Sequence, residues 1–377
     1  MSEWKTIPAD VFCDSVRDGT HDTPKPTQNG YKLVTGKHLK NGVIDPTDAY
    51  FISETDFKKI NERSKVDQWD VLMSMIGTIG EIAVVKEQPD YAIKNIALFK
   101  CAGSELKGRW LAYYLNSPIA KGYFIGNQKG SSQQFLSLKQ LRNLPILVTD
   151  EPYMQYVVDI LSRYDSLIEN YQKQIKLLEE AAQRLYKEWF VDLRFPGHEN
   201  TKIVDGVPEG WEKKRITDLL EIKYGKDHKK LLDGNIPVYG TGGIMRYANS
   251  SLYTGESVLI PRKGSLNNIM LVDGTFWTID TMFYSIPKID NSAKIAYLYL
   301  CERDMYSMNI GAAVPSMTIN ILNGMELLLP TDNLRREFEK FVGDYYQLIS
   351  SLQSQIRLLT EARDRLLPKL MSGEIEV

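Results

Sequence analysis

One arrangement of residues in this sequence could support hydrolysis of a phosphodiester bond. Asp90 is followed by Glu105 and Lys107. Two carboxylates and a lysine can hold Mg²⁺ and orient a water molecule for attack. The spacing rule is loose, and the second half of the chain has no equivalent. We therefore keep a self-contained Mg²⁺-dependent nuclease as an alternative and predict no catalytic residue in this chain.

Other catalytic and metal-binding patterns are missing from the sequence. None of the 4 histidines is spaced from another histidine or a cysteine as zinc ligands are. The sequence has no phosphate-binding GxxxxGK[ST] loop, no GxGxxG and no Gly-x-Ser-x-Gly. The glycine-rich stretch 240–243 is predicted to form a turn. We predict no metal site.

Composition indicates an ordinary globular chain. Of its 377 residues, 43% are hydrophobic and 25% are charged. No apolar run is long enough to span a membrane, and the N-terminus does not resemble a signal peptide. The 3 scattered cysteines argue against a disulfide framework, so we expect a reducing cytoplasm. The net charge of −2 is unusual for a stand-alone nucleic-acid binder, so any basic surface must be local.

Residues suited to contacting nucleic acid occur in two groups of predicted loops. Arg and Lys can bind guanine or phosphate, Gln can bind adenine, and Ser and Thr can bind either bases or phosphates. The first group is Arg17, Thr20, His21, Thr23, Lys25, Lys37, His38, Lys129, Ser131, Ser132, Gln133 and Gln134. The second group is Lys223, Lys226, His228, Lys229, Lys230, Tyr239, Thr241, Arg262, Lys263 and Ser265. We predict that at least one cluster in each group contacts nucleic acid.

Short apolar runs bounded by glycine predict the elements that carry these loops. Buried strands are expected at 70–75, 82–85, 257–260 and 325–329. Short helices are expected at 109–115 and 293–301. The stretches 1–150 and 196–330 are therefore each predicted to form a compact α+β domain.

Two long amphipathic helices are predicted at 151–195 and in 331–377. Apolar residues recur there in alternating steps of four and three, the a/d pattern of a coiled coil. The central seam residues are Leu161, Tyr164, Ile168, Ile175, Leu178, Leu185, Val342, Tyr345, Ile349, Ile356, Leu359 and Leu366. Since such a narrow seam is best buried by one partner helix, we expect an antiparallel coiled coil. The alternative is two amphipathic helices within an ordinary helical domain.

The chain also repeats itself. Residues 174–185 and 355–366 are identical at eight of twelve positions, at an offset of 181. The same offset pairs Tyr164 with Tyr345 and Ser137 with Thr318. Upstream the match fades to Val71-Leu72 against Val258-Leu259 and Gly77 against Gly264, at a shifted offset. The sequence therefore predicts two halves related by a pseudo-twofold axis, each with a variable front and a repeated back.

The repeated segments resemble the specificity subunit of Type I restriction–modification enzymes. The resemblance spans essentially the whole chain and is strongest in 177–196 and 358–375. Pro208–Trp211 and Asp18–Pro24 resemble segments of the second and first target-recognition domains of that family.

The resemblance implies a non-catalytic DNA-recognition subunit that reads a split sequence. It implies two target-recognition domains, 1–150 and 196–330, and two conserved helices, 151–195 and 331–377. It implies double-stranded DNA, two methyltransferase subunits and restriction subunits as partners, and no membrane. S-adenosylmethionine, ATP and Mg²⁺ are then expected on the partner subunits, with no cofactor in this chain.

The length of the predicted helices suits a split DNA site. A helix from Val157 to Trp189 rises about 50 Å. At about 3.4 Å per base pair this equals about 14 base pairs. Two further alternatives remain open, namely a coiled-coil scaffold that binds only proteins and a free-standing DNA-binding regulator. The scaffold predicts no sequence-selective DNA binding even with partners present, whereas the regulator predicts tight binding by the chain alone.

Overall fold

The computed structural model describes residues 4–129, 134–308 and 316–375. It contains two compact units. Unit 1 comprises Met1–Asn170 and Gln355–Val377, and unit 2 comprises Tyr171–Ser354. The boundary between the two units crosses both long helices. The predicted borders of the recognition domains, at 150, 195 and 330, therefore stay a prediction. In the described part of the chain, no helix is long and apolar enough to cross a membrane.

Unit 1 is built on small sheets. Strand β1 (Lys5–Pro8) pairs with β11 (Pro145–Val148), and β4 (Leu39–Lys40) with β5 (Val43–Ile44). A four-stranded sheet has the order β2 (Ser15–Asp18), β10 (Ile96–Lys100), β7 (Val71–Ser74), β8 (Ile82–Val84). A three-stranded sheet has the order β6 (Phe51–Ile52), β3 (Tyr31–Thr35), β9 (Tyr91–Lys94). The helical elements of this part are α1 (Ala9–Phe12), η1 (Gly36–His38), α2 (Glu54–Ser64), α3 (Glu105–Asn116), α4 (Pro118–Asn127) and α5 (Leu138–Arg142).

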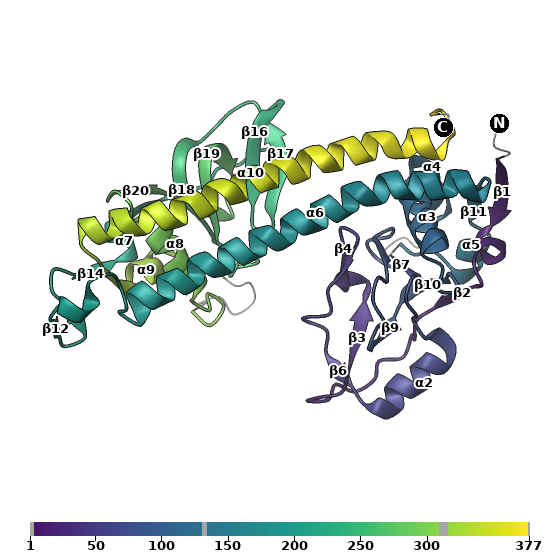
Figure 1. The fold of residues 1–377 in the computed structure, drawn as a ribbon, viewed down its shortest axis with the longest axis horizontal. Helices are drawn as coiled ribbons and strands as arrows, with labels where there is room; N and C mark the ends of the chain where they lie inside the picture. Colours follow the sequence, from purple (N-terminus) through teal and green to yellow (C-terminus); the bar gives the residue numbers. More distant parts are fainter. Residues whose placement is uncertain (1–3, 130–133, 309–315, 376–377) are drawn as a thin grey trace. The chain divides into compact units, whose positions relative to one another are not determined.

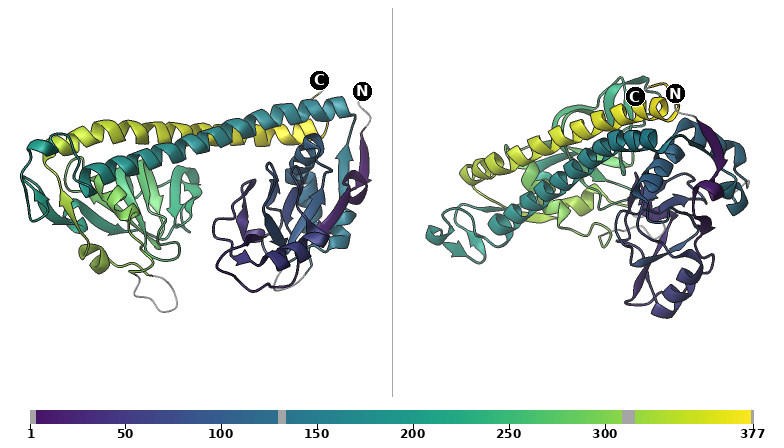
Figure 2. Two further views of the ribbon diagram at one scale, coloured as in Figure 1. Left: turned by 60° about the horizontal axis from the view of Figure 1, so that its bottom comes forward. Right: turned by 45° about the vertical axis from the view of Figure 1, so that its right-hand side comes forward.

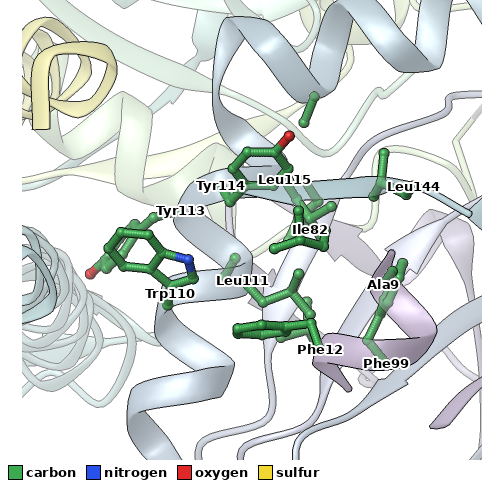
Figure 3. Packing of buried hydrophobic residues seen from close by; sticks show 14 of the residues in the cluster. Ala9, Phe12, Ile82, Phe99, Trp110, Leu111, Tyr113, Tyr114, Leu115 and Leu144 are labelled. Atoms are coloured by element: carbon green, nitrogen blue, oxygen red, sulfur yellow. The ribbon is translucent and has the colours of Figure 1, made fainter. Parts of the chain in front are cut away.

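The core of unit 1 forms around α3, whose aromatic residues are almost fully buried (Figure 3). Trp110 is completely buried, and its indole Nε1 donates to the Leu147 carbonyl at 3.0 Å. The same cluster includes Leu367, Leu370 and Met371 from the end of the chain. Burial of their side chains therefore fixes the last helical turns to the first domain of the sequence.

Unit 2 contains a six-stranded sheet. Its order is β15 (Leu220–Tyr224), β20 (Met282–Pro287), β18 (Tyr253–Pro261), β19 (Met270–Thr278), β16 (Asp233–Gly240), β17 (Gly243–Ala248). Two-stranded pairs join β12 (Ile203–Val204) to β13 (Val207–Pro208) and β14 (Glu212–Arg215) to β21 (Glu326–Leu329). The short helical elements are η3 (His198–Asn200), α7 (Ile216–Leu219), α8 (Ala293–Cys301) and α9 (Ile319–Asn323).

The ribbon formed by β18 and β19 has glycine on both strands at one position. Gly255 lies opposite Gly274, and both have positive φ, 135° and 130°. Side chains with a Cβ rarely adopt this backbone conformation. The two glycines therefore permit a backbone conformation at this point of the ribbon that other residues rarely adopt.

The two long helices are α6 (Glu151–Tyr186), continued by the π-helical turn η2 (Lys187–Val191), and α10 (Asp332–Met371). In each unit the segments of α6 and α10 lie side by side (Figures 1 and 2). In unit 1, Tyr153 Oη donates to Leu370 O at 3.1 Å and Arg363 Nη1 to Asp165 Oδ1 at 2.8 Å. As residue numbers rise along α6 they fall along α10, so the segments are antiparallel.

The helix segments of unit 2 are antiparallel as well. Trp189 and Phe190 lie 5.7 Å and 4.7 Å from Phe338 between ring centroids. Of the twelve predicted seam residues, Leu161, Ile168, Val342 and Ile349 are buried, and the other eight are partly buried. The predicted α+β class with two long helices is confirmed, as are the strands and short helices expected from the apolar runs.

The duplication reaches into the front of each half, where the sequences barely match. Ala9 N donates to Leu144 O, and Ile216 N donates to Met325 O. Leu136 N donates to Met75 O, and Met317 N donates to Arg262 O. The pair β1–β11 corresponds in the same way to β14–β21. Backbone hydrogen bonds therefore preserve the repeat where side chains have diverged.

One glycine in each half marks a close backbone approach that belongs to this repeat. A Cβ added to Gly19 would clash with the Ile93 carbonyl, and one added to Gly225 would clash with the Ile279 carbonyl. We expect Gly19→Ala and Gly225→Ala each to lower the free energy of unfolding by about 3 kcal/mol, because a rigid backbone must move. Urea unfolding of the full chain measures this.

Gly122→Ala is the matched control. Gly122 lies in α4, and an added Cβ there meets no atom within 4 Å. This change is expected to be neutral, or to stabilise by up to about 1 kcal/mol, since alanine favours a helix. Equal effects of all three substitutions would contradict the close-approach explanation.

Candidate nucleic-acid interface

The first predicted cluster surrounds the end of β2. Thr20 forms a backbone bridge with Lys94, whose Nζ donates to the Thr23 hydroxyl. His21 Nδ1 lies 2.8 Å from Asn95 Oδ1. The structure therefore brings Thr20, His21 and Thr23 together at the end of β9. Lys25 lies farther along the same segment and is exposed.

His21 also reaches a charged cavity next to β2. Its Nε2 lies 3.0 Å from Asp18 Oδ2. Asp18, Arg17, Arg63, Leu138 and Arg142 line a cavity of about 200 Å³. Asp18 is only 5% exposed and forms an ion pair with Arg63. This carboxylate therefore joins the predicted loop to a group of arginines.

The prediction that His38 lies in an exposed loop is wrong. His38 belongs to η1 and is 3% exposed. Its Nδ1 accepts a hydrogen bond from Thr35 N at 2.8 Å, and Nε2 lies 3.1 Å from Asp48. Burial lowers the pKa of His38 although Asp48 opposes the shift. The buried ring is hydrogen-bonded within the turn, and its exposed neighbour Lys37 pairs with Asp48 at 3.0 Å.

The glutamine- and serine-rich segment is only partly described. Ser131, Ser132 and Gln133 lie outside the described residues. Lys129 and Phe135 exchange backbone hydrogen bonds of 2.9 Å and 3.0 Å, and Gln134 O accepts from Gly77 N. Lys129 and Gln134 are exposed and lie beside the loop between β7 and β8.

In unit 2 the predicted residues Lys226, Thr241 and Arg262 lie among connected loops. Arg262 is stacked over Tyr224 at 5.4 Å, and its Nη1 donates to Asp280 O at 2.9 Å. Lys226 N donates to Thr278 O. These contacts join the ends of β15, β18 and β19 in one surface.

The remaining strand ends extend this surface. Asn268 Nδ2 donates to Thr241 O at 2.7 Å, and Trp277 Nε1 donates to Lys226 O at 3.0 Å. Tyr306 Oη donates to Gly264 O, between Lys263 and Ser265, which are both exposed. Basic and aromatic side chains held by backbone contacts suit binding to phosphates and base edges.

Other predicted residues of unit 2 lie elsewhere. Lys223 belongs to strand β15 and pairs with Glu221 at 2.5 Å. His228, Lys229 and Lys230 form a turn in which Leu231 N donates to His228 O. The prediction that Tyr239 lies in a loop is wrong. Tyr239 belongs to β16, and its ring lies 6.2 Å from that of Phe276, measured between centroids. Burial raises the pKa of Tyr239.

Sequence reasoning missed Arg63, Arg142 and Asn95. Arg63 ends α2 and Arg142 ends α5, and each reads from the sequence as an ordinary basic residue of a last helical turn. Asn95 has φ of 54°, a conformation in which asparagine is enriched. The basic residue in the last turn of each helix was the one sequence signal for these arginines. It did not indicate that they line the same cavity.

The structure places the residues of the nuclease alternative on different elements. Asp90 precedes β9, whereas Glu105 and Lys107 lie in the first turn of α3. Glu105 accepts a hydrogen bond from Arg109 at 2.7 Å. Within residues 4–129, 134–308 and 316–375, no three His, Cys, Asp or Glu side chains gather as metal ligands would.

Comparisons of this chain with known proteins all point to one family. A model of the Type I restriction modification DNA specificity domain matches residues 1–180 and 208–358. The Type I restriction enzyme MjaIX specificity subunit of Methanocaldococcus jannaschii is 25% identical over 344 residues, covering 81% of this chain and 78% of the relative. The HindI specificity subunit of Haemophilus influenzae is 21% identical over 336 residues, covering 67% and 73%.

A solved structure has the same fold. It is the S subunit of a Type I restriction–modification system from M. genitalium, with a TM-score of 0.57 and 16% identity. The similarity covers 98% of this chain and 96% of that one.

Proposed function

This chain belongs to the family of Type I restriction modification DNA specificity domains, and from that premise we propose that it supplies sequence recognition to a Type I restriction–modification complex. The observation that carries the proposal is that each unit presents its own loop surface of basic and polar residues. Each unit exposes basic and polar residues at the strand ends of its own sheet, around His21 in unit 1 and around Arg262 in unit 2. Each unit reads one half of a bipartite DNA site and supplies no catalytic group.

The two half-sites differ because the two loop surfaces differ. His21 and Asn95 contribute to the first surface, whereas Tyr224, Arg262 and Trp277 contribute to the second. Helix α6 has 36 residues and rises about 54 Å. This rise equals the length of about 16 base pairs of DNA. We take it as the approximate length of the two half-sites together with the unread bases between them.

The partners we propose are double-stranded DNA, two methyltransferase subunits and restriction subunits. Leu167 and Leu358 of unit 1 are 42% and 56% exposed. At the repeat offset of 181, their counterparts Leu348 and Leu177 in unit 2 are 46% and 63% exposed. The same apolar pair is thus presented twice, which suits two copies of one partner.

Cofactors follow from these partners. S-adenosylmethionine, ATP and Mg²⁺ are assigned to the partner subunits. The near-neutral charge of the chain is consistent with this division, because the partner subunits can supply further contacts to DNA phosphates.

Methylome sequencing tests this function. The chain is co-expressed with its methyltransferase subunit in a host that lacks adenine and cytosine methylation, and the subunit alone is the control. We expect methylation at one split motif, and only in the co-expressing cells. Methylation at a continuous motif, or the same methylation from the subunit alone, would contradict the proposal.

A further inference from the structure

Three arginines from separate elements line the cavity of unit 1. Arg17 lies on β2, Arg63 on α2 and Arg142 on α5, and all three are exposed. The cavity has a volume of about 200 Å³, and Leu138 contributes its apolar wall. These residues are 46, 79 and 125 positions apart in sequence. The fold alone therefore creates this concentration of positive charge.

Internal contacts hold the arginines in place without using all their donors. Arg17 donates from Nη1 to Arg63 O at 2.8 Å and from Nε to Ser15 Oγ at 3.1 Å. Arg142 donates from Nε to Val16 O at 3.2 Å. A guanidinium carries five N–H donors in a planar fork. Arg63 pairs with Asp18 through Nη2. Among the contacts of the described residues, each arginine therefore keeps N–H donors that can bind a ligand.

The carboxylate in the cavity is already engaged. Asp18 is 7% exposed at its side chain, and it contacts both Arg63 and His21. Three guanidinium groups and one carboxylate give the lining a net charge of +2. The ligand must then offer acceptors and negative charge, since the single acidic side chain of the lining already has partners.

In the described part of unit 2, the counterparts of Asp18 and Arg142 are uncharged. Asp18 lies opposite Ala97 on β10, and at the corresponding place Tyr224 lies opposite Phe283 on β20. At the repeat offset of 181, Arg142 corresponds to Asn323, whose Oδ1 accepts from Thr217 at 2.6 Å. The cavity is therefore a feature of the first half, added to a common fold.

We propose that this cavity binds one backbone phosphate of DNA and so fixes the register of unit 1 on its half-site. The inference rests on the proposed function. A phosphodiester carries a negative charge, and its oxygens match the guanidinium fork. A base edge is neutral and flat, and a group of three arginines in a concave site exceeds what one base needs. The contact adds affinity and orientation without reading sequence.

The test measures DNA affinity as a function of salt for the full chain with its methyltransferase partner. The probes are a 30-base-pair duplex of random sequence and one that carries the methylated motif. Loss of one phosphate contact lowers the slope of log affinity against log salt by about 0.9. We expect Arg142→Gln to show this loss and to weaken binding to both duplexes about tenfold, which is about 1.4 kcal/mol.

Lys139→Gln is the matched control, because Lys139 is an exposed residue of the same helix that does not line the cavity. It removes the same charge and is expected to leave the slope unchanged. Arg142→Lys keeps the charge but loses the fork, so intermediate affinity is expected. Thermal unfolding of each variant checks that the fold is intact.

Several results would overturn the inference. Equal slopes for Arg142→Gln and Lys139→Gln, with the wild type binding DNA, would remove the phosphate site and leave the proposed function standing. A loss confined to the motif duplex would assign Arg142 to base reading. Binding of inorganic phosphate that Arg142→Gln abolishes while DNA affinity stays unchanged would assign the cavity to a free anion. Absence of motif-specific binding by the wild-type complex would refute the proposed function itself.

Discussion

Inserting seven residues into each long helix is expected to lengthen the unread DNA between the half-sites by about three base pairs. The insertions follow Asn170 in α6 and Ser354 in α10, where each helix passes from one compact unit to the other. Seven residues add about 10 Å of helix. They also keep the a/d register, because the seam repeats every seven residues.

The methylated motif of the co-expressed variant gives the measurement. Both half-sites are expected to keep their sequence, since the loop surfaces are unchanged, and only the spacer should grow. Insertion into α6 alone is the control, because it displaces the seam residues of one helix against the other and is expected to abolish methylation. A methylated motif with the original spacer would show that helix length does not set the separation.

Replacing Lys294 with Met is expected to lower the free energy of unfolding of unit 2 by about 3 kcal/mol at pH 7. Lys294 lies on α8 and is 9% exposed. Its Nζ is 2.5 Å from Glu256 on β18 and 2.5 Å from Glu339 on α10. Burial alone would lower the pKa of Lys294, but the two carboxylates outweigh it and the pKa is raised. Without the lysine, two carboxylates remain in a largely buried site.

The loss of stability should shrink as the pH falls. Burial raises the pKa of Glu339, and Lys294 opposes this shift, so the pKa should rise further in the variant. A carboxyl group whose pKa is higher in the folded state stabilises that state below its unfolded pKa and loses this contribution as pH rises. The deficit is therefore expected to be largest near pH 7 and smaller near pH 5.

Urea unfolding at pH 5, 6 and 7, followed by tryptophan fluorescence, measures this dependence. Lys340→Met is the matched control, because Lys340 is exposed on the same helix that carries Glu339. The double variant Lys294→Met/Glu339→Gln should recover part of the loss at pH 7, since one buried charge is removed. A deficit below about 1 kcal/mol, or one that grows toward pH 5, would contradict the role of Lys294.

The sequence by itself determined the long helices, the main strands and the repeat in the helices. Heptad spacing predicted the helices that the structure places at Glu151–Tyr186 and Asp332–Met371. Apolar runs predicted β7, β8, β18 and β21. These features depend on residues that are only a few positions apart in sequence, so the local pattern of apolar residues is enough to predict them. The family resemblance was strongest in the helices, at 177–196 and 358–375, where the repeat is also clearest.

Only the tertiary structure decided which side chains meet. His38 and Tyr239 looked like loop residues, yet long-range packing buries the first in a turn and half-buries the second in a strand. Arg17, Arg63 and Arg142 looked unrelated, yet β2, α2 and α5 bring them to one cavity. Strand register also showed that Asp18 and Tyr224 occupy equivalent positions in the two halves, although their residue types do not match. Contacts between residues far apart in sequence arise from burial and pairing of whole elements, and no local pattern encodes them.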